Sequence, residues 1–471
     1  MGVKKHRRVL FWVFSNTKKC VVFKKKYLRG PAMLFPSDMC VLTLFYAFLM
    51  HKKILENIVD SKSKKDLKNV IWEAFYEIAF PENLPSIKIV ILNAPCNGFG
   101  DLIFALKLSN FLKEWYNCEV TIVTTLEKGL LGLGADPKLV IGFTGKSKNL
   151  QCRRFSTLKM NRELPIQDLI IVAPLQIDFD PDLKDVKKIF PYANILNTFT
   201  FSEYNDSTRK KFDFNMGIGQ ERDGIFITNV IPGQINFSLQ NPYVIVYVAQ
   251  DLANVNKCVG SFVELVSAKY SKQGVKKIDI IVPPWFTDIK KSLIKIVEKY
   301  YGKIVLILPD KSEKILAEGD TNSILTFRAD VLPVPNPVML KLMTESLNDI
   351  LVTGDQSISD ALSCCPDKNI FYQIAPWKGD FGKNLEKLLP NPYFKSVKTS
   401  CGSIKAVRYK SHYRKFIKNW SFTNLGKPKL DAIVLSIIGM KTDLYIKSIA
   451  DLILQSRTLK SLQKKVEEIL P

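Results

Sequence analysis

Residues 350–362 read ILVTGDQSISDAL, and this stretch decides the fold. The hydrophobic run 349–353 predicts a buried strand, which leads through Gly-Asp-Gln-Ser directly into a short helix. Strand, tight turn and helix in this order form the repeating unit of α/β proteins. The main-chain N–H groups of residues 356–358 can hold a diphosphate without a metal ion. Asp355 and Ser357 can also cap the helix, in which case the turn is an ordinary structural one.

The next apolar run, 369–373, continues into Pro-Trp-Lys and so brings an aromatic and a cation to the same edge of the sheet. Lys378 is a candidate partner for a phosphate, although an exposed lysine is usually only solvated. Tyr372 and Trp377 can stack on a nucleobase, or they can pack in the core or at its rim.

Strand-like and helix-like segments alternate over two blocks of the chain. In the first block, strands are predicted at 87–92, 119–124, 139–142, 168–173 and 194–201, with a helix at 102–116. In the second block, strands are predicted at 243–248, 277–282, 303–308, 323–327, 349–353 and 369–373, with helices at 258–271, 288–300, 339–347 and 357–363. Each block therefore predicts a parallel sheet with helices on both faces.

The two blocks predict an α/β fold with two tandem Rossmann-like domains and a cleft between them. We expect the first domain at 50–235 and the second at 236–395. The glycine-bearing segment 217–224 is the expected hinge between the domains. Its Gly-x-Gly is expected to be a loop, and a role in the hinge or in acceptor binding stays open. Residues 396–471 are expected to form a basic segment that ends in a lysine-rich helix.

The N-terminal residues 1–49 do not resemble either block. They contain ten basic residues and one acidic residue, and their longest apolar run is shorter than the ~18–20 residues of a membrane-spanning helix. Three interpretations stay open: a basic amphipathic anchor at a membrane surface, a poorly ordered extension, or an untranslated segment before a true start at Met50.

The net charge of the chain is +23, from 68 basic and 45 acidic side chains. Because +9 of this belongs to residues 1–49, the remainder is only moderately basic, and the charge alone does not predict nucleic-acid binding.

Two kinds of site are excluded by composition. The chain has three histidines, His6, His51 and His412, too few for a histidine-rich metal site. Its nine cysteines contain no C-x-x-C pair, which favours reduced thiols over zinc ligands or a disulfide framework. We expect no metal ion and no tightly bound cofactor.

The first predicted strand is followed by a second glycine turn. It reads Asn97-Gly98-Phe99-Gly100-Asp101, and the glycines allow the backbone to turn sharply. Asp101 then stands at the start of a helix and faces the crevice beyond the carboxyl end of the strand, where ligands bind in open α/β sheets. The alternative is that Asp101 is only an N-cap.

Together these motifs resemble the GT-B glycosyltransferases. The strand, Gly-Asp-x-Ser and helix, followed by a strand that closes on aromatic-x-Ile-x-Pro, are similar to a GT-B donor-binding domain. The nearest similar family is that of the bacterial protein-arginine rhamnosyltransferases that modify elongation factor P. That family has Asp-Asn-Tyr/Phe-Gly-Asp near its N-terminus, and this chain has the turn at 97–101. It also has a Leu-Pro…Pro segment before Arg-Gly-Glu-Asp-Ser, where this chain has Leu332-Pro333-Val334-Pro335 and then 353–357.

The resemblance implies roles for particular residues. Asp101 matches the catalytic base, Asp355 stands where the family has a catalytic Glu, and Ser357 matches a phosphate contact. The implied site for the donor nucleotide and its diphosphate comprises Gly354, Gln356, Ser357, Ile358, Tyr372 and Lys378. The implied acceptor side comprises Asn97, Gly98, Phe99 and Gly100. The sugar, the nucleotide and the acceptor are not carried over.

The resulting prediction is a hexosyl- or deoxyhexosyltransferase that uses a nucleoside-diphosphate sugar, without a metal and with inversion. Its acceptor is a protein, glycan or lipid, and its location is the cytoplasm or, through residues 1–49, a membrane surface. Two alternatives stay open. One is an inactive GT-B-like binding protein, because Asn97 and Asp355 depart from the family pattern. The other is a basic protein that associates with nucleic acid, a partner that the motifs do not favour.

Overall fold

The computed structural model describes residues 87–438 with several gaps. The gaps are 96–98, 117, 145–158, 161–162, 165–166, 176–185, 187–188, 191–196, 206–211, 229–238, 250–254, 320–321, 390–393 and 409–413. The predictions for the N-terminal extension and for the C-terminal helix fall outside the described residues. The chain forms two compact units: Ile89–Phe111 with Val120–Gly426, and Met1–Lys88 with Leu112–Glu119 and Lys427–Pro471.

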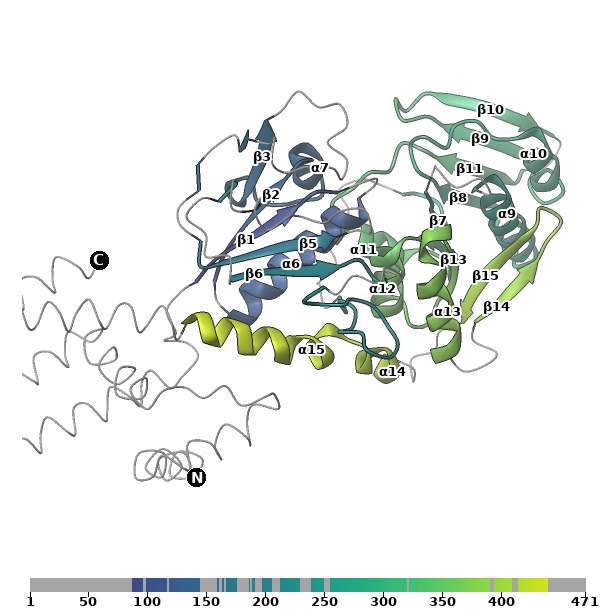
Figure 1. The fold of residues 1–471 in the computed structure, drawn as a ribbon. Coiled ribbons are helices and arrows are strands. Elements are labelled where there is room, and N and C mark those ends of the chain that lie inside the picture. Colours follow the sequence, from purple (N-terminus) through teal and green to yellow (C-terminus); the bar gives the residue numbers. More distant parts are fainter. Residues whose placement is uncertain are drawn as a thin grey trace, which may run out of the picture. The chain divides into compact units, whose positions relative to one another are not determined.

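The larger unit contains both predicted sheets (Figure 1). In the first sheet the strands lie in the order β4 (Lys159–Met160), β3 (Val140–Thr144), β2 (Glu119–Thr124), β1 (Lys88–Asn93), β5 (Leu169–Leu175) and β6 (Thr198–Ser202). Pairing is parallel from β2 to β3, β1 to β5 and β5 to β6, and antiparallel at β4. A β-branched run such as that of β1 forms a strand because both of its faces are buried.

The direction of strand addition reverses at β1. The chain passes from β1 to β2 and β3 on one side, and then returns to add β5 and β6 on the other side. The carboxyl ends of β1 and β5 therefore meet at a topological switch point, where α/β sheets bind their ligands. Helix α6 (Gly100–Tyr116) begins just after β1 and so starts at this point.

Two further helical elements of the first half have described bounds, and both are short: α7 (Glu127–Gly132) and the 3-10 turn η2 (Pro137–Leu139). Val90, Leu92, Val123, Ile170 and Val172 from the strands form one core with residues that follow β5.

The second sheet runs from β10 at one edge to β14 at the other (Figure 1). Its order is β10 (Glu313–Glu318), β9 (Lys303–Ile307), β11 (Ile324–Arg328), β8 (Lys277–Ile281), β7 (Tyr243–Tyr247), β12 (Asp349–Thr353), β13 (Asn369–Gln373), β15 (Ser403–Arg408) and β14 (Phe394–Lys398). The strands from β9 to β13 are parallel, and β10, β15 and β14 are antiparallel.

A second reversal lies between β7 and β12. After β7 the chain adds β8, β9 and β11 on one side, and it then returns to place β12 on the other side of β7. The turn that follows β12 is the Gly-Asp-Gln-Ser stretch at 354–357, so this turn lies at the switch point of the second sheet.

Helices cover the second sheet. They are α9 (Val255–Lys272), α10 (Lys291–Val297), α11 (Asn336–Glu345), α12 (Asp355–Cys364), η5 (Pro376–Lys378) and α13 (Gly379–Leu388). The buried side chains of α9, α10 and the six parallel strands form the main core. Helix α12 packs against β12 and β13.

Two short helices follow the second sheet: α14 (Arg414–Asn419) and α15 (Phe422–Leu425). Phe422 joins a buried aromatic cluster with Phe201, Phe214 and Phe226, so the segment after the second sheet packs on rings from the first half of the chain. A further helix, 427–438, belongs to the smaller unit. Within that unit the Tyr116 hydroxyl donates to Asp431 Oδ1 at 2.6 Å.

The structure confirms the predicted fold class, an α/β protein with two Rossmann-like parallel sheets. The domain limits and the cleft stay predictions. The second sheet continues past residue 395, because β14 and β15 extend it, and the sequence analysis did not anticipate these strands. No helix among the described residues is both long enough and apolar enough to span a membrane.

Candidate functional site

Helix α12 begins abruptly, directly after β12. Gly354 has φ 79° and ψ 164°, a conformation that is essentially restricted to glycine. The first helical bond runs from the Ile358 N–H to the Gly354 carbonyl, at 3.2 Å, so the N–H groups of 355–357 precede the helical ladder. Among the described residues, no side chain caps the helix. The alternative in which Asp355 or Ser357 is an ordinary cap is therefore wrong.

Replacing Gly354 with alanine should lower the free energy of unfolding by about 1–3 kcal/mol, because a side chain disfavours this backbone conformation. A Cβ at Gly354 meets no other atom within 4 Å, so the loss would reflect the backbone alone. Urea denaturation measures it. Gly100→Ala is the matched control, since Gly100 is also open but helical, and an unchanged or higher stability is expected there. Equal losses in both variants would contradict this explanation.

Asp355 is a buried carboxylate at the first position of α12. Its Oδ2 lies 2.7 Å from the Lys378 Nζ, and its side chain is 11% exposed. Its Oδ1 is buried and has no hydrogen-bond partner among the described residues. Burial raises the pKa of Asp355, and Lys378 acts in the opposite direction.

Lys378 lies at the end of η5 and is buried as well, with 8% of its side chain exposed. Its ammonium pairs with Asp355 and also with Glu203, which directly follows β6 of the first sheet. Burial alone would lower the pKa of Lys378, but the two carboxylates together raise it above its ordinary value. The interpretation of Lys378 as a solvated surface residue is therefore wrong, since a cation in this position is held by its partners.

Further polar atoms near the start of α12 are buried without a hydrogen bond within the described part of the chain. They are Gln356 Oε1, Tyr372 Oη and Gln373 Nε2. The three side chains are 4%, 1% and 2% exposed. Buried polar groups are normally satisfied, and the exceptions mark places where a ligand or water completes the structure. Burial is the main cause of the raised pKa of Tyr372, and the negative charge of Asp355 raises this pKa further. Tyr372 and Asp355 are therefore close in space.

Of the other predicted donor residues, Ser357 is half-buried and Ile358 is fully buried on α12. Ile358 packs in the core, and its main-chain N–H already donates to the Gly354 carbonyl. The side chain of Trp377 is not among those described.

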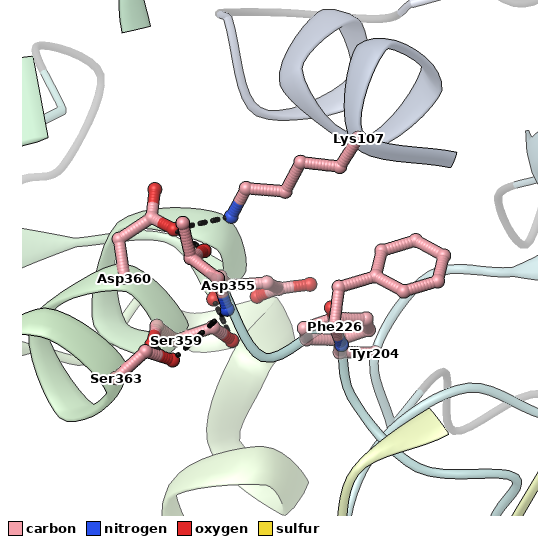
Figure 2. Close-up of polar contacts among 8 residues, drawn as sticks. Lys107, Tyr204, Phe226, Asp355, Ser359, Asp360 and Ser363 are labelled. Atoms are coloured by element: carbon pink, nitrogen blue, oxygen red, sulfur yellow. Dashed lines mark hydrogen bonds and ion pairs between the residues drawn. The ribbon is translucent and has the colours of Figure 1, made fainter. Parts of the chain in front are cut away.

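Tyr204, two residues after the end of β6, contributes to the site at the start of α12. The Tyr204 hydroxyl accepts the Phe226 N–H at 2.7 Å, and its ring stacks on Phe381 of α13 with centroids 6.1 Å apart. Figure 2 shows Tyr204 and Phe226 together on one side of Asp355. The site at α12 therefore includes residues from both halves of the chain.

A second buried ion pair lies further along α12 (Figure 2). The Lys107 Nζ of α6 is 2.5 Å from Asp360 Oδ1, and each side chain is 5% exposed. Asp360 also accepts a hydrogen bond from the Thr228 hydroxyl. The main-chain N–H of Thr228 in turn donates to the Ser363 hydroxyl at 3.3 Å. Helices α6 and α12, each at the switch point of its own sheet, are thus joined directly.

The switch point of the first sheet is organised by Asn93 at the end of β1. Its amide donates to the Ala173 carbonyl at 3.0 Å and to the Asp101 carbonyl at 3.2 Å. Its Oδ1 accepts from Thr124 Oγ1 at 2.9 Å. One buried amide therefore ties three strand ends and the start of α6 together, and this holds Asp101 at the carboxyl edge of the sheet.

The predicted acceptor-side residues are described only in part. Asn97 and Gly98 lie outside the described residues. Phe99 is 38% exposed, and Gly100 is helical rather than part of the turn. The inference that Gly100 permits a sharp turn is wrong, because its φ is an ordinary one and α6 already begins there.

Six site residues were not anticipated from the sequence: Asn93, Lys107, Glu203, Tyr204, Asp360 and Gln373. Asn93 had a local signal, since a polar side chain that ends a hydrophobic strand lies at the ligand edge of the sheet. The two ion pairs had none, because their partners are far apart in the chain. Among the described residues, no group of three His, Cys, Asp or Glu side chains could hold a metal ion.

Comparisons with known proteins give only distant similarities. No family model matches the chain, and no curated protein matches its sequence. A heptosyltransferase of E. coli, solved with ADP-2-deoxy-2-fluoro heptose, is 9% identical with a TM-score of 0.31, over 61% of this chain and 88% of that chain. A glycosyl transferase family 9 protein from Veillonella parvula is 10% identical with a TM-score of 0.32, over 66% and 92%.

An alpha-glucosyltransferase, solved with UDP and a 13-mer DNA, is 9% identical with a TM-score of 0.33, over 77% of this chain and 95% of that chain. All three proteins are glycosyltransferases. Similarities at this level assign no family to the chain.

Proposed function

We propose that the chain is a glycosyltransferase that transfers a sugar from a nucleoside-diphosphate sugar, and that the start of α12 holds the donor diphosphate. The observation that carries the proposal is the position of this helix. It begins uncapped at the switch point of a parallel sheet, beside buried polar atoms that have no partner among the described residues.

An anion at this position would meet two positive contributions, and it would share the second, the Lys378 ammonium, with Asp355 and Glu203. The N–H groups that precede the helical ladder carry the positive end of the helix dipole, and Lys378 adds a full positive charge nearby. Neither contribution requires a metal ion, so we include metal independence in the proposal. The Gly-Asp-x-Ser motif at this turn is similar to that of GT-B donor domains, which supports a nucleotide sugar over other phosphates.

The first sheet would supply the base. Asp101 lies at the switch point of that sheet, at the start of a helix that is joined to α12 by the Lys107–Asp360 pair. A carboxylate there can remove the proton of an acceptor hydroxyl or amide as it attacks the anomeric carbon. A single displacement of this kind inverts the configuration of the sugar. The sugar and the acceptor are left unassigned.

A panel of nucleoside diphosphates should raise the melting temperature of the protein in the presence of EDTA. A ligand at about one hundred times its Kd stabilises the folded state by about 2.7 kcal/mol, which corresponds to a rise of about 3–4 °C for a chain of this length. Differential scanning fluorimetry with UDP, GDP, dTDP and ADP would measure it. The matching nucleosides are the control, because they lack the diphosphate that α12 should bind.

A panel in which no nucleoside diphosphate raises the melting temperature would overturn the proposed function. Stabilisation without turnover of any matching nucleotide sugar would instead favour the inactive binding protein.

A further inference from the structure

The turn that follows β6 reaches from the first sheet to the start of α12. Two of its residues contact the second half of the chain: Glu203 pairs with Lys378, and Tyr204 stacks on Phe381. Asn205 binds Ile218, whose carbonyl also accepts a hydrogen bond from Asn384. These contacts give the first sheet a direct connection to the proposed donor site.

The backbone around this turn fixes its position. Asn205 has a φ of 50°, and its side-chain amide donates to the Ile218 carbonyl at 2.7 Å and accepts the Ile218 N–H at 2.9 Å. Gly217 lies so close that a Cβ there would be 2.3 Å from Asn205 Oδ1. The Gly-x-Gly of the predicted hinge therefore holds the 203–205 turn in place, and Glu203 has a defined position.

Glu203 and Asp355 share a single buried ammonium. Their side chains are 15% and 11% exposed, so water screens the three charges weakly. The group has two negative charges and one positive charge, a formal total of −1. A diphosphate at the start of α12 brings further negative charge to the same ammonium. Glu203 and the diphosphate are thus in competition for Lys378.

We propose that Glu203 is a positioning residue of the donor site: it holds Lys378 on Asp355 and competes with the donor diphosphate for that lysine. This inference rests on the proposed function. This competition lowers the affinity for the nucleoside diphosphate that remains after sugar transfer. The lower affinity favours release of this product. The first sheet, which carries the proposed acceptor side, would in this way influence how long the second sheet retains the nucleotide.

The test compares nucleoside-diphosphate and nucleoside affinities by isothermal titration calorimetry. In Glu203→Gln the shape is retained and the formal charge of the group becomes zero, so the diphosphate should bind at least about fivefold more tightly. In Lys378→Met the formal charge becomes −2, and the diphosphate should bind at least about tenfold more weakly. The affinity for the uncharged nucleoside should stay the same in both variants, whereas a general disturbance of the fold would change both affinities.

Glu318→Gln is the matched control. Glu318 pairs with Lys303 on the edge strand β10, and its side chain is 62% exposed, so the same substitution there should alter neither affinity. Glu203→Ser serves as a second neutral variant if Glu203→Gln does not fold, with the same expected gain in diphosphate affinity.

The outcomes separate the two proposals. If the wild-type protein binds no nucleoside diphosphate, the proposed function and this inference are both overturned. If the wild-type protein binds one, and the neutral variants at position 203 bind it equally or more weakly, only the role of Glu203 is overturned.

Discussion

Replacing Asp101 with asparagine should reduce turnover of the donor sugar by about 10²–10⁴-fold, the usual contribution of a general base. Asparagine has nearly the same shape but cannot accept a proton. The hydrogen bond from Asn93 to its main-chain carbonyl does not involve the carboxylate and should persist. The measurement is the release of sugar to water from the nucleotide sugar whose nucleoside diphosphate gives the largest thermal shift.

Asp136→Asn is the control for this substitution. Asp136 is exposed and caps η2 by accepting the Lys138 N–H at 2.9 Å, a contact that an asparagine oxygen can also make. Its turnover should match that of the wild-type protein. Nucleotide affinity should be unchanged in both variants. Full turnover by the Asp101 variant would show that another group acts as the base.

Replacing Lys107 with methionine should lower the free energy of unfolding by about 3–5 kcal/mol, the usual effect of removing one partner of a buried ion pair. Methionine fills a similar volume, so the loss should come from the uncompensated charge of Asp360. Thr228 would still donate to that carboxylate, but a neutral hydroxyl replaces only part of the lysine's effect. Urea denaturation monitored by circular dichroism measures the change.

The double variant Lys107→Met/Asp360→Leu checks the cause. With both charges absent, no buried ion is left unpaired, and most of the lost stability should return. Lys303→Met is the matched surface control, because its pair with Glu318 is exposed and should contribute at most about 1 kcal/mol. A double variant that is no more stable than Lys107→Met would attribute the loss to packing.

The sequence predicted the fold well where a single strand carries the signal. The runs that became β1, β12 and β13 have continuous apolar centres, as expected of strands that are buried on both faces. The edge strands β10 and β14 were missed because edge positions admit lysines and glutamates, which interrupt the pattern.

The part of the candidate site that is contiguous in the sequence could be predicted. The part that is formed by residues far apart in the chain could not. The turn at Gly354 was evident, because strand, glycine and helix adjoin in the sequence. The environment of Lys378 was not, since its burial depends on Glu203 from a different sheet. Contacts between distant parts of the chain decide whether a lysine is solvated or is enclosed by two carboxylates. The residues next to the lysine in the sequence do not predict these contacts.

The place of β12 also matters while the protein is being made. β7 is synthesised early and pairs with β8 on one side, but its other neighbour, β12, emerges from the ribosome only after β8, β9, β10 and β11. At about 5–20 residues per second, β7 waits on the order of 5–20 s with one edge unpaired. During that interval the apolar edge can bind chaperones or other nascent chains. The strand that completes the proposed nucleotide site is thus also the one that ends this exposure.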